Sequence, residues 1–244
     1  MPSSPSRPPR HGPGLVPAFV SVTLGLLAVG LAVPRLYAET ATLVGQAAIA
    51  DVNRTGPGRT APDRLEDAAT LLDDAARISG SPTAHSLAGQ AHLLLADHAV
   101  RNGLRAGVEA AAARLRASVA ANPAAPYVWA RLTHAEYRSG RPTAAARAWH
   151  MSVLTGPYDP DLMERRLIQG WGLQDWLEPP ARAAFEEQVR LSWRQDPGET
   201  TLFARRHEAE ALLRRLLADD PEALGDFNLR YGRLPSADSA DARP

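Results

Sequence analysis

The chain has 244 residues, of which 45% are hydrophobic, enough for one domain with a hydrophobic core but too few for two large ones. Its 27 basic and 27 acidic residues cancel, so the total charge gives no support for binding to nucleic acid. The sequence contains neither Cys nor Lys, which excludes disulfides, thiolate metal sites, cysteine nucleophiles, Schiff-base catalysis and the phosphate-binding lysine of a P-loop.

The first predicted element is a membrane anchor. Residues 1–13 form a basic, Pro-rich leader that we expect to be disordered, and residues 14–33 form an uncharged apolar run. A helix of about 20 residues rises about 30 Å, which is the thickness of the hydrocarbon core of a bilayer. We therefore predict a transmembrane helix over residues 14–36 that lies in the lipid bilayer. A cleavable signal peptide is the alternative, although its apolar region is usually shorter and Leu36-Tyr37-Ala38 is a poor cleavage site.

The charges beside the apolar run predict its orientation. Arg7 and Arg10 precede the run, whereas Arg35 and then the acidic Glu39 follow it. Because basic flanks favour the cytoplasmic side, we predict a single-pass protein of the inner (cytoplasmic) membrane. Its N-terminus would be cytoplasmic, and its C-terminal domain would be periplasmic or otherwise extracytoplasmic.

The remainder of the chain is predicted to be all-α. A helical stalk and linker over residues 37–61 precede a series of helical segments separated by Pro and Gly signals. Asp159-Pro160 and Asp220-Pro221 each offer a side-chain cap followed by a proline in the first turn. Short loops between the helices favour antiparallel neighbours, and a tail over residues 234–244 is expected to be disordered. The predicted helices cover residues 63–78, 83–101, 104–121, 126–139, 142–154, 161–173, 180–194, 200–218 and 221–231.

One segment carries a repeat signature. Its apolar and turn residues are Trp129, Leu132, Gly140, Ala145, Trp149 and Pro157. With these spacings the segment resembles one complete tetratricopeptide repeat, with Thr133 and Glu136 as departures from the family pattern. Weaker matches precede it: Ala111, Leu115 and Pro123 lie one repeat length upstream, and Ala68, Leu72 and Ala75 fit another second helix.

The resemblance predicts a fold and a domain organisation. Residues 62–157 would form a short stack of tetratricopeptide-like antiparallel helix pairs, and residues 158–233 would be a C-terminal helical region that caps the stack. An unrelated helical bundle is the alternative for this region.

Residues that could support catalysis or metal binding do not form convincing sets. His85, His92 and His98 lie in one predicted helix, but their spacing does not place two of them on adjacent turns, as a helical zinc site requires. Acidic pairs such as Asp73-Asp74 are sequence neighbours on a helix, so their side chains diverge. We therefore predict no catalytic residue, no metal site and no cofactor, and we expect the protein not to be an enzyme.

The resemblance also implies a binding surface. In tetratricopeptide-like stacks the first helix of each pair lines a groove, and the matching positions here include Tyr127, His134, Tyr137 and Arg138. Aromatic and Arg side chains are typical of recognition surfaces, so these four residues are the predicted protein-binding site. Simple exposure to solvent is the other reading of these residues.

Two functional hypotheses follow. The first is a membrane-anchored scaffold that binds other membrane or envelope proteins and no nucleic acid; the resemblance implies an accessory role in bacterial envelope or exopolysaccharide assembly. The alternative is an enzyme or glycan-binding protein with a Trp-rich pocket in the C-terminal helical region, lined by Trp171, Trp176 and Trp193. Trp side chains around one open cavity would favour the second hypothesis, and Trp side chains buried between helices would favour the first.

Overall fold

The computed structural model describes residues 15–55, 62–101 and 107–234, and within these ranges the chain is helical with no strand. The predicted leader over residues 1–13, residues 56–61 of the predicted stalk and linker, and the predicted tail from residue 235 lie outside the described residues. The helices are α1 (Leu15–Thr55), α2 (Pro62–Ser79), α3 (Pro82–Arg101), α4 (Val108–Ala121), α5 (Pro126–Arg138), α6 (Pro142–Thr155), α7 (Pro160–Gly172), the 3-10 turn η1 (Gln174–Trp176), α8 (Pro179–Gln195), α9 (Pro197–Arg206), α10 (Glu210–Leu216) and α11 (Pro221–Arg233).

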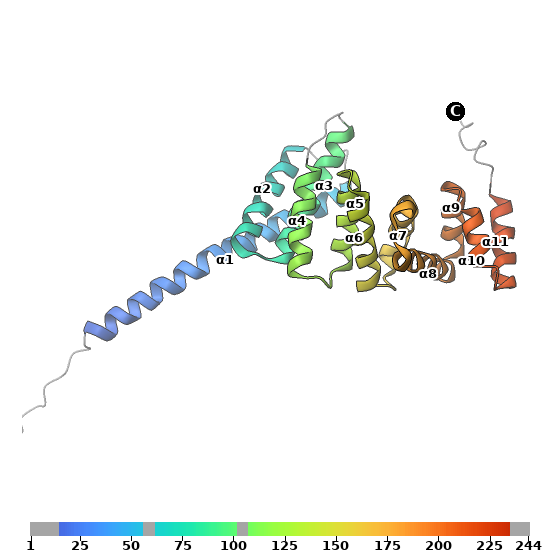
Figure 1. The fold of residues 1–244 in the computed structure, drawn as a ribbon. Helices are drawn as coiled ribbons and strands as arrows, with labels where there is room; N and C mark the ends of the chain where they lie inside the picture. Colours follow the sequence, from blue (N-terminus) through green and yellow to red (C-terminus); the bar gives the residue numbers. More distant parts are fainter. Residues whose placement is uncertain (1–14, 56–61, 102–106, 235–244) are drawn as a thin grey trace, which may run out of the picture.

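Most helices pack chiefly against their neighbours in the chain. The most extensive interfaces are those of α1 with α2, α2 with α3, α3 with α4 and α5 with α6. Figure 1 shows the result, a row of helices that runs from α2 to α11, with the N-terminal part of α1 projecting from one end. Each pair buries an apolar face that a single helix could not bury alone. The fold is therefore all-α, with a tetratricopeptide-like stack of helix pairs, as the sequence predicts.

A recurring hydrogen bond holds the two helices of a pair together. Ser118 of α4 donates to the carbonyl oxygen of Pro82 at the start of α3, at 2.8 Å. Ser152 of α6 donates in the same way to the carbonyl oxygen of Pro126 at the start of α5, at 3.0 Å. Gln188 of α8 donates to the carbonyl oxygen of Pro157 before α7, at 2.9 Å. The same kind of contact therefore joins the two helices in each of the three successive pairs α3/α4, α5/α6 and α7/α8.

A second recurring contact extends the repeat to α1 and α2. A Cβ atom built at Gly45 of α1 would lie 2.4 Å from Leu72 Cγ of α2, and one built at Gly89 of α3 would lie 2.6 Å from Leu115 Cγ of α4. The same close approach occurs at Gly170 of α7, where a Cβ atom would lie 2.5 Å from Phe185 of α8. Each glycine lets two helix axes come close together, because any side chain would push them apart.

The stalk predicted for residues 37–61 differs from the structure. α1 is one continuous helix, and its second half buries Ala38, Ala41, Ile49 and Val52 against the helices that follow. This half takes the place of a first helix in a repeat, with α2 as the second. The physical reason is its own apolar spacing, which gives α1 a face that must be covered.

Local signals at several helix ends are confirmed. The carboxylates of Asp159 and Asp220 accept hydrogen bonds from the backbone N–H groups of Asp161 and Ala223, as expected for N-caps. Gly140, with a φ of 73°, ends α5 in the left-handed conformation that favours glycine.

One predicted helix is two helices. The segment 200–218 lacks a Pro or Gly breaker, yet the structure divides it into α9 and α10, with Glu208 at a φ of 55° between them. The turn allows Phe203 of α9 and Leu213 of α10 to enter the same hydrophobic core. Burial of both side chains favours a break that no local signal predicts.

Candidate protein-binding groove

Four helices that are far apart in sequence surround one hollow of about 520 Å³. These helices are α1, α3, α5 and α7, the first members of the four successive pairs. The hollow is lined by Asn53 of α1, Gln90, Leu93, Leu94 and Asp97 of α3, Arg131 and His134 of α5, and Glu164, Arg165, Ile168 and Gln169 of α7.

A second hollow of about 400 Å³ lies beside the first and shares His134, Ile168 and Gln169 with it. Its other lining residues are Thr133, Tyr137, Arg138, Trp171, Gly172, Leu173 and His207. We refer to the two hollows together as the groove. Its walls combine charged groups in the first hollow with aromatic and aliphatic side chains in the second.

Three of the four predicted site residues lie in the groove. His134 lines both hollows, and Tyr137 and Arg138 line the second. Tyr127 lines neither hollow. Its hydroxyl donates to Asp159 Oδ1 at 2.9 Å and to Asp161 Oδ2 at 3.3 Å, at the start of α7, and the hydrogen bond to Asp159 is the main reason that its pKa is raised to about 12. Tyr127 therefore contacts the next repeat.

Arg138 forms contacts with α3 that the sequence does not predict. Its guanidinium forms an ion pair with Asp97 of α3 and donates to the carbonyl oxygen of Ala96 at 3.4 Å. The contact with His134, and then the charge of Arg138, lower the pKa of Asp97 although its partial burial opposes them. Arg138 thus joins α5 to α3 and also presents part of its surface to the groove.

Two groove residues were missed at the sequence level, Arg131 of α5 and Arg165 of α7. Partial burial lowers the pKa of Arg131, and the charge of Arg165 lowers it further. Both side chains line the first hollow, so two positive charges share one surface. No local sequence pattern in either helix predicts that the two side chains line one hollow, because this depends on the register between α5 and α7.

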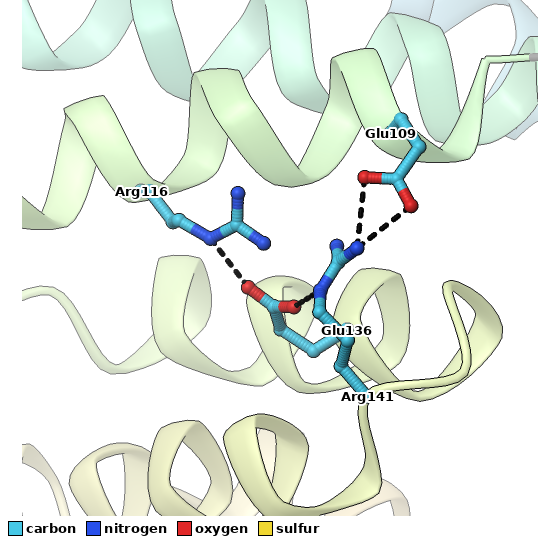
Figure 2. A network of polar contacts seen from close by, with 4 residues as sticks. All are labelled: Glu109, Arg116, Glu136 and Arg141. Carbon is cyan, nitrogen blue, oxygen red and sulfur yellow. Dashed lines mark hydrogen bonds and ion pairs between the residues drawn. The ribbon is translucent and has the colours of Figure 1, made fainter.

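Glu136, one of the predicted departures from the family pattern, belongs to a polar network outside the groove. Its buried carboxylate accepts hydrogen bonds from Arg116 Nε of α4 at 2.6 Å and from Arg141 Nε at 2.5 Å. Arg141 also pairs with Glu109 at 2.7 Å, and Figure 2 shows the four side chains in one chain of contacts. The network joins α4, α5 and the start of α6.

The Trp side chains do not gather around one cavity. Trp149 is buried, donates its indole N–H to the carbonyl oxygen of Arg166 at 2.9 Å and packs edge-on against Phe185. Trp193 is buried against Phe227. Trp171 lines the groove, whereas Trp176 borders a separate hollow of only about 50 Å³. This arrangement gives no support to a Trp-rich pocket of the kind predicted by the alternative hypothesis.

The histidines are also dispersed. His92 pairs with Asp73, and His134 faces Asp97 at 4.0 Å. Within the part of the chain that the structure describes, no group of three or more His, Asp or Glu side chains is placed to hold a metal ion.

No family model and no curated protein matches the sequence. A solved structure of PilF from Pseudomonas aeruginosa aligns with 80% of this chain and 92% of that chain, at 14% sequence identity and a TM-score of 0.36. At that TM-score the assignment of the fold rests on the helix packing described above.

Proposed function

We propose that the protein is a membrane-anchored scaffold that holds a segment of a partner protein in the groove. The observation that carries the proposal is the groove itself, which the first helices of four successive pairs line together. Helical-repeat proteins of this architecture bind peptides or helices along such extended surfaces. Tyr137 and Ile168 are 49% and 43% exposed there, so large side chains are available for contact.

The N-terminal half of α1 supports the anchor. The segment Phe19–Thr55 is the one helix within the described residues that is long and apolar enough to cross a membrane, by length and composition. Large side chains such as Phe19, Leu24, Leu27 and Leu31 are exposed around it. An exposed apolar surface of this length is unfavourable in water and suits the hydrocarbon core of a bilayer.

Because α1 is continuous, it would hold the groove at a defined position relative to the membrane. The helix runs without a break from the apolar segment to Thr55, and Asn53 near its end lines the groove. The groove would therefore lie at a fixed distance from the membrane surface, where it would meet a partner that is itself in the membrane or in the envelope. We further propose an accessory role in bacterial envelope or exopolysaccharide assembly, with the domain on the periplasmic side of the inner membrane and without catalysis.

Site-specific photo-crosslinking in native membranes tests the scaffold. A photoreactive residue at Ile168 lies in the groove, whereas one at Leu154 of α6, which is exposed, borders no part of it. We expect a discrete adduct with one protein from position 168 and none from position 154. Equal labelling from both positions, or none from position 168, would contradict binding in the groove.

A further inference from the structure

The first hollow is lined by two positive charges, Arg131 and Arg165, that form no ion pair within the described residues. Among the described residues, no carboxylate lies within ion-pairing distance of Arg131 or Arg165. Arg131 donates a hydrogen bond to Ser86 Oγ at 3.4 Å. The contrast with Arg138 is clear, because that side chain is paired with Asp97 in the same groove. Arg131 is partly buried and Arg165 is exposed. Both line one hollow, so an anion that enters it would be attracted by two positive charges.

The charges near this pair do not neutralise it. Asp97 is already engaged by Arg138 and His134. Glu164 borders the hollow and, like Arg165, is exposed to solvent, so water and salt screen the charges of both, but the two form no ion pair. A carboxylate that enters the hollow could therefore pair with two guanidinium groups that form an ion pair with neither Asp97 nor Glu164.

The surroundings of the pair indicate what kind of molecule would carry the anion. Leu94 and Ile168 line the same hollow as the two Arg side chains. Beyond Ile168 the groove continues past Tyr137 and Trp171. A free phosphate ion would use the Arg pair and leave this apolar surface empty, whereas a protein segment could contact both.

We propose that the groove selects an acidic protein segment, in which an Asp or Glu side chain bridges Arg131 and Arg165 and a large apolar side chain lies against Ile168 and Trp171. This inference rests on the proposed function and adds the chemistry of the partner. Arg binds carboxylates through paired N–H donors, and the apolar contact supplies the remaining affinity. The Arg pair then acts as the element that rejects neutral and basic segments, because these would leave the two charges unpaired.

Selection from a random peptide library tests the inference without knowledge of the natural partner. The library would be twelve-residue peptides with amidated C-termini, so that only Asp and Glu side chains supply carboxylates. The target would be the full chain in detergent micelles. We expect the selected peptides to contain an acidic residue near a large apolar one, and to bind less tightly as the salt concentration rises.

Charge variants then locate the contact. The double change Arg131→Gln and Arg165→Gln should weaken binding of the selected peptides roughly tenfold to hundredfold, which is the usual effect of losing charge-assisted hydrogen bonds. The matched control, Arg147→Gln and Arg233→Gln, removes two exposed charges outside the groove and should leave the affinity unchanged. Circular dichroism should show the same helix content in both variants.

The possible failures are distinguishable. If no peptide is selected, or if Ile168→Asp leaves binding of the selected peptides unchanged, the groove is not a peptide site, and the proposed function and the inference both fail. If the peptides require Ile168 but show no excess of Asp and Glu, only the acidic preference is overturned. Acidic peptides that bind the Arg131→Gln, Arg165→Gln variant as tightly as the original protein would also overturn it.

Discussion

Arg116 of α4 and Glu136 of α5 form an ion pair, with 2.6 Å between Nε and Oε1, that joins one helix pair to the next. His92 of α3 and Asp73 of α2 are related in the same way, one repeat earlier and with the acidic and basic partners exchanged. The two contacts occupy corresponding positions at successive interfaces. At both interfaces a polar pair therefore joins one helix pair to the next.

The buried carboxylate of Glu136 should make stability depend on pH. Burial alone would raise its pKa, but hydrogen bonds from Arg116 and Arg141 outweigh burial and lower the pKa below 4.5. A group with a lowered pKa stabilises the fold above its unfolded-state pKa, and this contribution is lost as the pH falls through the folded-state value. Glu136→Gln should lower the free energy of unfolding by about 1–3 kcal/mol at pH 7.

Urea titrations of the full chain in detergent, at several pH values, measure this effect. The difference between the original protein and Glu136→Gln should shrink below about pH 4.5 as the carboxylate becomes protonated. The control is Glu187→Gln, which removes an exposed ion pair with Arg194 and should cost less than about 1 kcal/mol. A constant difference between the Glu136→Gln variant and the original protein at all pH values would show that the carboxylate charge is unimportant.

Trp149 is the largest fully buried side chain, and it lies where α6 meets α7 and α8. Trp149→Ala should lower the free energy of unfolding by about 3–5 kcal/mol, because it removes a large apolar group and leaves a cavity. Arg147, two residues away on the exposed side of the same helix, is the matched position, and Arg147→Ala should change stability by less than about 0.5 kcal/mol. Similar effects of both changes in a denaturant titration would mean that the helix faces are assigned incorrectly.

Replacement of Gly170 by a residue with a side chain should destabilise the protein. A methyl group there would lie 2.5 Å from Phe185 and 2.9 Å from Trp149, so Gly170→Ala should destabilise the protein by about 1–3 kcal/mol through overpacking. Gly225 of α11 has no atom within 4 Å of the same built position, and Gly225→Ala should stabilise by about 0.4–1 kcal/mol because alanine favours helix. Thermal unfolding followed by circular dichroism separates the two, and shifts in the same direction would refute the close packing at Gly170.

Tyr137 and Arg138 both line the groove, but their substitution should have different effects on stability. Arg138→Ala breaks the pair with Asp97 and should cost about 1 kcal/mol of stability, whereas Tyr137→Ala should cost less than about 0.5 kcal/mol because its side chain is exposed. Tyr137→Ala should nevertheless reduce the crosslinked adduct formed at position 168, since aromatic side chains often dominate binding. Undiminished adduct with Tyr137→Ala would remove this residue from the binding site.

The anchor prediction concerns topology. A reporter that is active only in the cytoplasm should be active when fused after Arg10, and inactive when fused after Ala61. The expected orientation follows from Arg7 and Arg10 before the apolar run. A mature protein that begins near Glu39 would replace the anchor with a cleaved signal peptide, and cytoplasmic activity of the second fusion would reverse the orientation.

The sequence by itself determined the helices and most of their ends. Gly140 and the Asp-Pro pairs at 159–160 and 220–221 act within a few residues of the backbone groups they satisfy, so local chemistry is sufficient to place them. The spacing of Trp129, Ala145 and Trp149 similarly identified one repeat, because helix periodicity is visible along a single helix. In the structure Trp149 of this repeat is buried.

Only the tertiary structure decided which side chains meet across the stack. Gly45 with Leu72 and Gly89 with Leu115 set the separation of their helices, and the first contact also brings α1 into the repeat. The division of 200–218 into α9 and α10 likewise depends on a shared core. Arg131 and Arg165 lie on helices separated by α6, and they line one hollow only because the intervening contacts fix the rotation and register of α5 and α7. Such a relationship is the sum of many packing contacts between residues distant in sequence, and no local pattern encodes it.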